Sequence, residues 1–548
     1  MKIFSWKKLL LILAACLAAY SCSDFIKIID DEPYHIINVE NDYLGIAFSG
    51  NINGETHPCG CRHFPLGGLP HVAGVIHELK QVQELLYVDA GDTFFPSSTL
   101  PSSLKDSLTF AAKNLAKGLA QLGLKYFVPG DQDFAAGENF LKEILVESGI
   151  QMLVANLKKT QSFPHKTWIK INKGPQVIFI TGLVDPIVLP TQFQYLFTPI
   201  DVAFKAVVQE MKDNGYDEKS PFHRLVVVSN AGMEPDKNFA KSYPFIDWII
   251  GAHSQSFTNI PNEEGSTQLV QVLSRNHYMG EIKFSLKTNK KDDKYKIHEV
   301  RQDKGKLLNP NPYFVFIDQH KAQLTKLQAN EQARSTFQGT TEEKMSTASS
   351  CIDCHDDQGK KWKSTAHALA FVTLVNNKEE FNLACIKCHS VGIKDKKGFS
   401  KAVDLISISS SLKDDKKKNI SQDKQYKSYV NSLRKAFGNI KSVRNLSPKI
   451  LHAHANKIQE LENTMDIVHN FSSVQCLNCH EQHTEHPFEP SGYVKISSKA
   501  MTQKMQEKCM DCHDPDQSPE WYKGKQLNME IFSKGLKKVA CPKRQEDY

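Results

Sequence analysis

The sequence predicts two domains of different class: an α/β layered domain, followed by a mainly α-helical domain with little sheet. Short β-rich runs alternate with helical patterns between residues 40 and 305, which is typical of an α/β fold. Eight of the 13 cysteines then form a regular set between residues 351 and 512. A polar stretch with two prolines, a helix-forming stretch and a Ser/Thr-containing linker separate the two regions.

The first 22 residues have the features of a processing signal. Basic residues precede an apolar run from Leu9 to Ala19, which is shorter than the about 20 apolar residues that span a bilayer. Cys16 and Cys22 each resemble the lipidation site of bacterial lipoproteins and are the lipidation candidates. We therefore expect an exported, periplasmic or outer-surface protein that is anchored to the membrane as a lipoprotein. Plain secretion and an uncleaved anchor are the alternatives.

The β-rich runs of the first domain are expected to be its strands. They are 43–48, 85–88, 177–183, 225–228 and 248–250. Several of them are followed by Gly, Asn or Asp, which places the functional loops at the ends of the strands.

These loops resemble those of the metallophosphoesterase domain of the 5'-nucleotidase family, in the same order along the chain. The matching segments are Val88-Asp89-Ala90-Gly91-Asp92, Gly130-Asp131-Gln132-Asp133-Phe134, Ala155-Asn156-Leu157, Ser229-Asn230-Ala231-Gly232 and Gly251-Ala252-His253-Ser254-Gln255. The resemblance covers most of residues 40 to 305. It implies an α/β/β/α sandwich with a cleft that binds two metal ions.

The metal ligands of that family are mostly replaced in this chain. The resemblance implies that Asp92 is the bridging carboxylate and that His253 is a surviving ligand. Amides replace the other ligands and the reactive His, at Asn51, Asn53, Gln132, Asn230 and Gln255. Amide oxygens are weak ligands for transition metals, so we expect an inactive domain that acts as a scaffold or binds a partner, with no catalytic residues.

Two alternatives stay open for this cleft. One is a single-metal remnant built on Asp92, Asp131 and His253, and the other is a phosphoesterase that retains activity. The substrate-binding domain that follows in the nucleotidases has no room here, which argues against nucleotide hydrolysis. Cys59 and Cys61 lie in a loop beside the cleft and are a disulfide, a metal pair or a redox pair.

The eight regular cysteines form four Cys-x-x-Cys-His motifs. They are Cys351-Ile352-Asp353-Cys354-His355, Cys385-Ile386-Lys387-Cys388-His389, Cys476-Leu477-Asn478-Cys479-His480 and Cys509-Met510-Asp511-Cys512-His513. Two thiols on one helical turn can add to the two vinyl groups of one haem, and the next residue is then held under the iron. Zinc sites do not require a His after every pair, and four such small disulfide rings are disfavoured. The motifs therefore predict four covalent haem c groups, with His355, His389, His480 and His513 as proximal ligands.

A sixth ligand would distinguish electron transfer from chemistry at the iron. Seven further histidines follow residue 319: His320, His367, His452, His454, His469, His483 and His486. The distal candidates are His367, His486, His454 and His469.

Residues 345 to 520 resemble the cytochrome c-554 family of tetrahaem electron carriers. The segment from Trp362 to Phe371 is similar to the family signature Trp-x-x-Ser-x-His-Ala-x-Ala-Phe, with Thr365 at the position of the Ser. Val474-Gln475-Cys476 leads into the third motif as in that family, but Glu481-Gln482-His483 replaces its Gly-Pro-Gly turn. The resemblance implies that His367 and His486 are distal ligands and that one haem can lack a strong sixth ligand.

Residues 391 to 475 are rich in Lys and Ser, and 423–465 has the pattern of one or two helices. The lysines are expected to form a solvated face, with a docking patch for an acidic redox partner as the alternative. The net charge of +7 is too small over 548 residues to indicate nucleic-acid binding.

The expected domains are a signal (1–22), the nucleotidase-like domain (40–305), a linker with a helix (306–350), the tetrahaem domain (351–520) and a tail (521–548). The expected function is electron transfer to or from a redox protein or a quinone-linked donor or acceptor, with haem as cofactor. A multihaem oxidoreductase that acts at an open haem is the main alternative, and a ligand-binding cleft above Asp92 is another. A metal ion besides haem iron is not part of the expected function.

Overall fold

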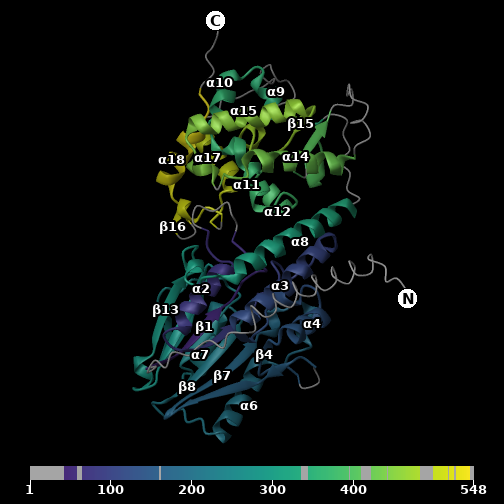
Figure 1. Cartoon of the computed structure of the whole chain (residues 1–548). Helices are drawn as coiled ribbons and strands as arrows, with labels where there is room; N and C mark the ends of the chain where they lie inside the picture. The colour runs from purple at the N-terminus through teal and green to yellow at the C-terminus, as the bar shows by residue number, and fades with distance from the viewer. Residues whose placement is uncertain are drawn as a thin grey trace, which may run out of the picture.

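The computed structural model describes residues 42–58, 65–158, 162–334, 344–393, 395–408, 421–440, 442–481, 498–515, 517–523 and 526–542. The chain forms an α/β body and a smaller helical body, with the long helix α8 (Pro312–Arg334) between them (Figure 1).

The first sheet of the α/β body has seven strands in the order β13-β12-β1-β2-β3-β4-β5. Strands β1 to β5 run parallel, and β12 and β13 add an antiparallel edge. The strands are β1 Tyr43–Ser49, β2 Glu84–Asp89, β3 Leu124–Phe127, β4 Gln151–Leu153, β5 His165–Lys166, β12 Tyr278–Ser285 and β13 Lys294–Glu299. Helices α2 (Leu69–Lys80), α3 (Lys105–Leu122) and α4 (Glu138–Ser148) cover its outer face (Figure 1).

The second sheet has six strands in the order β10-β11-β9-β8-β7-β6. The strands are β6 Trp168–Lys173, β7 Gln176–Val184, β8 His223–Asn230, β9 Trp248–Gly251, β10 Asn262–Glu264 and β11 Thr267–Val270. Helices α6 (Ile200–Asp213) and α7 (Met233–Ser242) cover it. The expected strands are therefore present, each within two residues of its predicted bounds.

Alternating side chains explain the four layers of the α/β body. On β7, Ile178 and Ile180 join the core between the two sheets, while Phe179 and Leu183 pack under α6 and α7. Successive side chains of a strand point to opposite faces, so a strand that is apolar on both faces must be covered on both. The α/β fold expected from the sequence is confirmed.

Helix α8 occupies the stretch that was expected to be a linker and binds both bodies. Its Glu331 carboxylate accepts a hydrogen bond of 2.7 Å from the backbone N–H of Ser107 at the start of α3. The neighbouring Gln332 accepts a hydrogen bond of 2.8 Å from the backbone N–H of Ala402 in the helical body. The helix expected within residues 306–350 is therefore present as α8, and it contacts both bodies.

The helical body is built from short helices around one compact core. They are α9 Ala348–Ile352, α10 Asp356–Lys363, α11 Ala370–Asn377, α12 Leu383–Ile386, α14 Gln422–Phe437, α15 Pro448–Thr464, α16 Cys476–Cys479, α17 Ser498–Met510 and α18 Met529–Val539. Phe371, Tyr426, Tyr429, Leu433 and Phe471 are among its buried residues. The pattern over 423–465 corresponds to two helices, α14 and α15.

Sheet in the helical body is limited to two small ribbons among the described residues, β14 (Ile406–Ile408) with β15 (Ile467–Asn470) and β16 (Tyr522–Lys523) with β17 (Gln526–Leu527). The stretch after residue 520 was expected to be a tail, but it contains α18. The buried Phe532 of α18 packs edge-on against Trp521, with ring centres 6.1 Å apart. This contact joins the end of the chain to the fourth cysteine motif.

Within the part of the chain that the structure describes, no helix combines the length and the apolar character that crossing a bilayer requires.

Candidate functional site

Each cysteine motif lies on a helical turn. In the first, third and fourth motifs, the N–H of the final His donates to the carbonyl of the first Cys four residues earlier, at 3.0, 2.8 and 2.8 Å. In the second motif, the N–H of His389 donates to Ile386 instead. A helical turn brings both thiols and the following His to one side of the backbone, as attachment to one haem requires.

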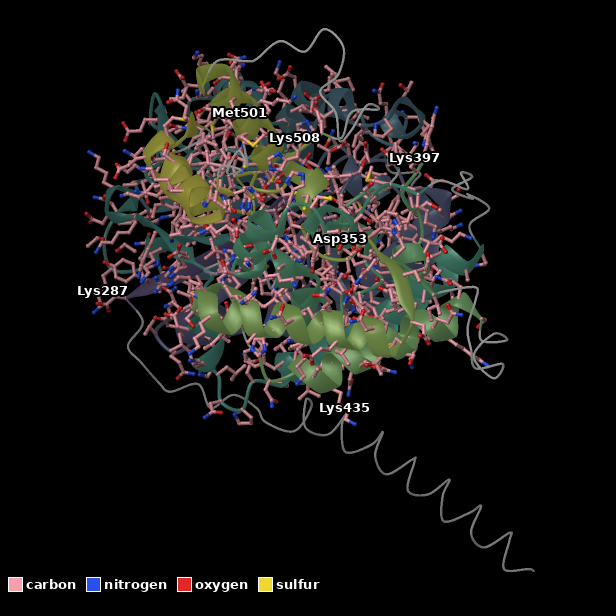
Figure 2. All side chains as sticks on the ribbon, turned by 90° about the horizontal axis from the view of Figure 1, so that it is seen from above. Lys287, Asp353, Lys397, Lys435, Met501 and Lys508 are labelled. Atoms are coloured by element: carbon pink, nitrogen blue, oxygen red, sulfur yellow. The ribbon has the colours of Figure 1, made fainter. Side chains whose placement is uncertain are left out.

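The motifs meet in two pairs, first with third and second with fourth. The thiols of Cys351 and Cys476 are hydrogen-bonded, which lowers the pKa of Cys351 to about 7. Cys388 and Cys512 are hydrogen-bonded in the same way, which lowers the pKa of Cys388. No disulfide forms among the described cysteines, so all eight motif thiols are free. Seen from above, Asp353 of the first motif lies between α17, marked by Met501 and Lys508, and α14, marked by Lys435 (Figure 2).

Hydrogen bonds of Gln475 connect the segments that carry the first and third motifs. Its side-chain oxygen accepts a hydrogen bond of 2.6 Å from the N–H of Ala348, and its amide donates to Ser472 at 2.7 Å. Nearby, the indole of Trp362 donates to the carbonyl of Val474 at 2.8 Å. These hydrogen bonds explain why Gln475 and Trp362 occur at their positions in the sequence signature.

Two of the proximal histidines are oriented as metal ligands usually are. Nδ1 of His389 lies 2.6 Å from the carbonyl of Ala370, and Nδ1 of His513 lies 2.9 Å from the hydroxyl of Ser518. A ring nitrogen that donates to the protein fixes the tautomer and leaves Nε2 as the ligand atom. These residues fit the covalent haem groups that the sequence predicts.

His367 lies beside the fourth motif. Its ring centre is 6.3 Å from that of His513, and Trp521 stacks on a face of the His513 ring at 4.3 Å with an interplanar angle of 3°. Two imidazoles on opposite sides of one metal ion have ring centres about 6 Å apart, because each metal–nitrogen bond is about 2 Å. Burial lowers the pKa of His367, so the ring is neutral as a ligand must be.

The other distal candidates differ in their surroundings. His454 on α15 meets the ring of Phe437 edge-on at 5.4 Å, and His469 lies 4.6 Å from the ring of Phe471 with a buried Nδ1 that has no hydrogen-bond partner. His486 lies outside the described residues, as do Cys16, Cys22, Cys59 and Cys61.

A second cluster of polar residues lies in the α/β body. Asn53, Asp92 and Asp131 follow the carboxyl ends of the parallel strands β1, β2 and β3 of the first sheet, while Asn230 ends β8 and His253 follows β9 of the second sheet. Ligands of α/β proteins bind outside the carboxyl ends of parallel strands. We call these five residues and Gln132 the polar cleft.

Asp92, Asp131 and His253, the predicted remnant site, lie together in the polar cleft. One ligand atom from each of them lies within 4.8 Å of the other two. Nδ1 of His253 is 3.4 Å from an oxygen of Asp92 and 3.5 Å from an oxygen of Asp131. Interaction with Asp131 and with Asp92 raises the pKa of His253 to about 10.

Two residues near the cleft have structural roles instead. The amide of Asn51 donates to the carbonyl of Leu273 at 2.8 Å, and its oxygen accepts from the N–H of His253 at 2.9 Å. The buried carboxylate of Asp133 accepts hydrogen bonds from four backbone N–H groups, including that of Asp92 at 2.9 Å. Asn51 and Asp133 therefore stabilise the loops around the polar cleft. Their side-chain oxygens already accept hydrogen bonds from the backbone, so they are not counted among the candidate metal ligands.

A polar contact that the sequence did not predict joins the two bodies. Nε2 of His57 is 2.9 Å from a carboxylate oxygen of Glu379, which precedes the second motif. The hydroxyl of Thr56 joins Nδ1 of His57 at 2.8 Å to Nε2 of His320 on α8 at 3.1 Å. Lys321 is 3.6 Å from the same Glu379 oxygen. In the sequence, the residue that could have indicated this contact is His57, which lies two residues before Cys59.

Comparison with known proteins gives a different relative for each body. Residues 350–410 match the family described as cytochrome c554 and c-prime. A 5'-nucleotidase of Bos taurus is 22% identical over 213 residues, which are 36% of this chain and 35% of that protein. The chain thus spans about a third of the length of this curated relative. The two resemblances inferred from the sequence are confirmed.

Solved structures with a similar α/β body have low sequence identity. A sulfate thiohydrolase of Thermus thermophilus is 16% identical with a TM-score of 0.40, over 52% of this chain and 61% of that chain. A 5'-nucleotidase precursor of Thermus thermophilus is 16% identical with a TM-score of 0.41, over 52% and 58%. A calcineurin-like phosphoesterase of Bacillus subtilis is 15% identical with a TM-score of 0.39, over 52% and 98%.

Proposed function

We propose that this protein is an exported tetrahaem c-type cytochrome that carries electrons, with the α/β body as a scaffold or partner-binding module. The pairing of the motifs is the observation that supports this best. Cys351 contacts Cys476, and Cys388 contacts Cys512, so groups bound at neighbouring motifs would be close enough to exchange electrons. Haem iron supplies reversible one-electron chemistry when it is bound.

The residues around the motifs support this function by orienting the ligands. Ala370 and Ser518 hold the Nδ1 atoms of His389 and His513, which keeps each ring in one orientation and one tautomer. Trp521 packs flat on His513 and keeps water from that ring. Rigid ligands lower the reorganisation that accompanies each electron transfer.

Haem analysis of the purified protein tests the proposal. We expect four covalent haems per chain, and a loss of one haem when both cysteines of any single motif are replaced, for example Cys385→Ala with Cys388→Ala. The matched control is Cys541→Ala, because Cys541 belongs to no motif and should leave the count at four. A zinc content of one ion per motif without haem would contradict the proposal.

We propose His367 as the sixth ligand of the iron at His513, on the basis of their ring spacing of 6.3 Å. A His367→Ala variant should convert one haem from low spin to high spin, visible by electron paramagnetic resonance. His452→Ala is the control, since His452 is not a distal candidate. If wild-type protein already binds cyanide or nitrite, the alternative of an oxidoreductase with an open haem gains the support instead.

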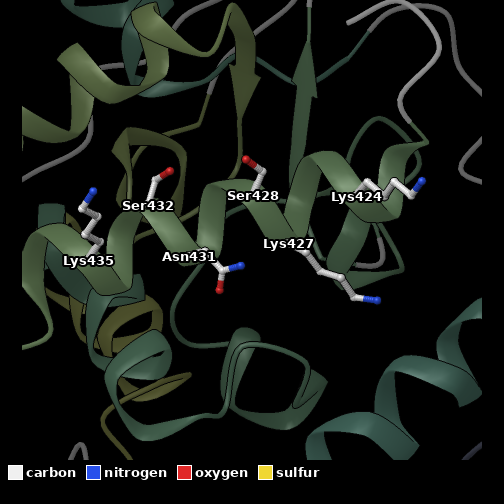
Figure 3. Close-up of a pocket in the computed structure, with 6 residues that line it drawn as sticks. All are labelled: Lys424, Lys427, Ser428, Asn431, Ser432 and Lys435. Atoms are coloured by element: carbon white, nitrogen blue, oxygen red, sulfur yellow. The ribbon is translucent and has the colours of Figure 1, made fainter.

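An exposed face of α14 supports docking of an acidic redox protein. Lys424, Lys427 and Lys435 lie along it with Ser428, Asn431 and Ser432, around a shallow groove of about 430 Å³ (Figure 3). The opposite face of the helix is buried in the core of the helical body. Lys427 pairs with Asp423 at 2.8 Å, so the face is positive mainly through Lys424 and Lys435.

Charge reversal on this face tests the docking proposal. Lys424→Glu with Lys435→Glu should slow electron transfer with an acidic partner at low salt, and the difference should shrink as salt increases. Lys537→Glu with Lys538→Glu on α18 reverses the same charge elsewhere and serves as control. Equal slowing by both pairs would exclude a specific role for α14.

Export and lipid anchoring are part of the proposal and rest on the signal-like first 22 residues. Incorporation of labelled fatty acid should be lost in either Cys16→Ala or Cys22→Ala, which identifies the modified residue. Labelling of neither the wild type nor any variant would exclude the anchor.

A further inference from the structure

The polar cleft contains buried polar atoms that the protein leaves without a hydrogen-bond partner. Among the described residues, 13 buried side-chain atoms lack such a partner, and six belong to the polar cleft. The six are Asn53 Oδ1, Asp92 Oδ2, Asp131 Oδ1, Gln132 Oε1, Asn230 Oδ1 and His253 Nδ1. The Asp92, Asp131 and His253 atoms form ion pairs of 3.4 and 3.5 Å with one another, so the three amide oxygens are the clearest exceptions. Buried polar atoms are nearly always partnered in native proteins, so a concentration of exceptions indicates a missing ligand.

Hydrogen bonds of the cleft residues orient these atoms. Asn230 is fully buried, and its Nδ2 donates to the carbonyl of Ala90 at 2.9 Å, which leaves Oδ1 as the free end of the amide. A side chain at Gly130 would collide with both Asp92, at 2.0 Å from Oδ1, and Asn230, at 2.7 Å from Nδ2. The carboxylate of Asp92 and the amide of Asn230 therefore face the same small space, which glycine keeps open.

The backbone of the cleft is held in a costly conformation. Asn53, Asp92 and His253 have φ angles of 56°, 56° and 70°, in the left-handed region that non-glycine residues rarely adopt. Such strain is maintained where the surrounding structure needs a side chain in one place, and it concentrates at ligand sites. Three residues from three different loops share it here.

The donor atoms do not fit the two-metal centre that the nucleotidase-like fold implies. Such a centre needs several imidazole nitrogens around a bridging carboxylate. The polar cleft offers one nitrogen, on His253, against five oxygens from Asn53, Asp92, Asp131, Gln132 and Asn230. Asn51 could not restore the set, because both ends of its amide are bonded to the protein.

We infer that the polar cleft binds one hard divalent cation, of the class of Ca²⁺, Mg²⁺ and Mn²⁺, in place of a pair of transition-metal ions. Carboxylate and amide oxygens are the ligands that such cations prefer, whereas zinc prefers nitrogen and sulfur. Asp92 and Asp131 bring two carboxylates, and a divalent cation would replace the proton that these carboxylates otherwise hold on His253. The ion would also tie the first sheet, through these two residues, to Asn230 and His253 of the second sheet.

Calorimetric titration of haem-loaded, EDTA-treated protein with CaCl₂, MgCl₂, MnCl₂ and ZnCl₂ tests this inference. We expect no second equivalent of zinc, and one equivalent of at least one of the first three ions. Affinity for it should fall at least tenfold in Asp92→Asn and in Asp131→Asn, and should be unchanged in Asp318→Asn, an exposed acid on α8. Binding of two equivalents of zinc or manganese, or of none of the four ions at millimolar concentration, would overturn the inference.

Substitutions that exchange one donor atom sharpen the test. Asn230→Asp adds a charged oxygen and should tighten binding of the hard cation, whereas Asn230→His adds a nitrogen and should shift the preference toward zinc. If either variant fails to fold, the wild type alone still decides. The favoured cation should raise the melting temperature of the α/β body by circular dichroism while the Soret band follows an unchanged transition. A shift of the Soret transition without a shift of the circular dichroism transition would place the ion outside the polar cleft.

Discussion

The two bodies of this protein differ in whether the surrounding protein holds their candidate functional side chains by hydrogen bonds. In the helical body, the protein itself holds the ring nitrogens of His389 and His513, with Ala370 and Ser518 as partners. In the α/β body, three amide oxygens of the polar cleft, on Asn53, Gln132 and Asn230, have no hydrogen-bond partner, while Asp92, Asp131 and His253 pair only with one another. The candidate ligands of the helical body are thus held by the surrounding protein, whereas those of the cleft are not.

The source of stability differs as well. The α/β body has a continuous core between two sheets and a second core under α6 and α7, so we expect it to fold without a bound group. The helical body has a single smaller core and short helices of which three carry four or five residues. Helices of that length are unstable alone, so covalent attachment of haem is expected to complete this body.

The largest expected effect is a loss of stability in the α/β body alone. Arg224 is fully buried, and its guanidinium binds Asp293 through two contacts of 2.7 and 2.8 Å. Arg224→Met should destabilise this body by about 3–5 kcal/mol, because it leaves a buried carboxylate unpaired. Urea denaturation followed by circular dichroism measures it, and the haem transition should not move.

The matched control for Arg224 is an exposed pair in the same body. Lys173 pairs with Glu84 on the surface, so Lys173→Met should cost less than about 1 kcal/mol. Equal losses in both variants would mean that burial of the Arg224 pair adds no stability. A parallel shift of the haem transition would mean that the two bodies unfold as one unit.

A smaller effect is expected where the two bodies meet. A double-mutant cycle of His57→Gln and Glu379→Gln should give a coupling energy of about 0.5–3 kcal/mol, because the two side chains are in contact and largely buried. The exposed pair Lys113 and Glu143 supplies the reference cycle, with a coupling of at most about 1 kcal/mol. A coupling near zero for His57 and Glu379 would show that the contact does not hold the bodies together.

The pH dependence of this contact appears only below pH 6.5, so at neutral pH it is the smallest of the three effects. Burial lowers the pKa of His320 to about 3, from an ordinary value of 6.5, and also lowers the pKa of His57. Both rings are therefore neutral in the folded protein and protonate more readily when it unfolds. Glu379 has its pKa lowered to about 2 despite burial, through the contact with His57 and the charge of Lys321.

Because the pKa values of His320 and His57 are lowered by folding, the folded protein loses stability as the pH falls. The stability due to His320 is present in full above pH 6.5 and is lost as the pH falls from 6.5 toward 3, by up to about 1.4 kcal/mol per pH unit. Urea midpoints at pH 7.5, 6.5, 5.5 and 4.5 measure the slope. A His320→Gln variant should show a flatter slope below pH 6.5, and an unchanged slope would reject this assignment.

Much of the fold could be predicted because the signals are local. Short β-rich runs predicted both β7 and β8, and the repeated Cys-x-x-Cys-His spacing predicted the helical turn of each motif. The contact of His57 with Glu379 could not be predicted, since 322 positions separate the two residues and either side chain alone suits a solvated surface. The helix at 529–539 was missed because its amphipathic pattern lies beyond the last motif, where nothing indicated a partner.

The sequence by itself determined which residues are candidates for binding: eight thiols and four histidines in the Cys-x-x-Cys-His motifs, and the carboxylates and amides around Asp92. Those are properties of residue type and spacing. Only the tertiary structure decided which motifs meet, that Asn51 is committed to the protein, and that the oxygens of Asn53, Gln132 and Asn230 are left free. The physical reason is that partnership depends on contacts between strands and loops far apart in the chain, which local patterns do not encode.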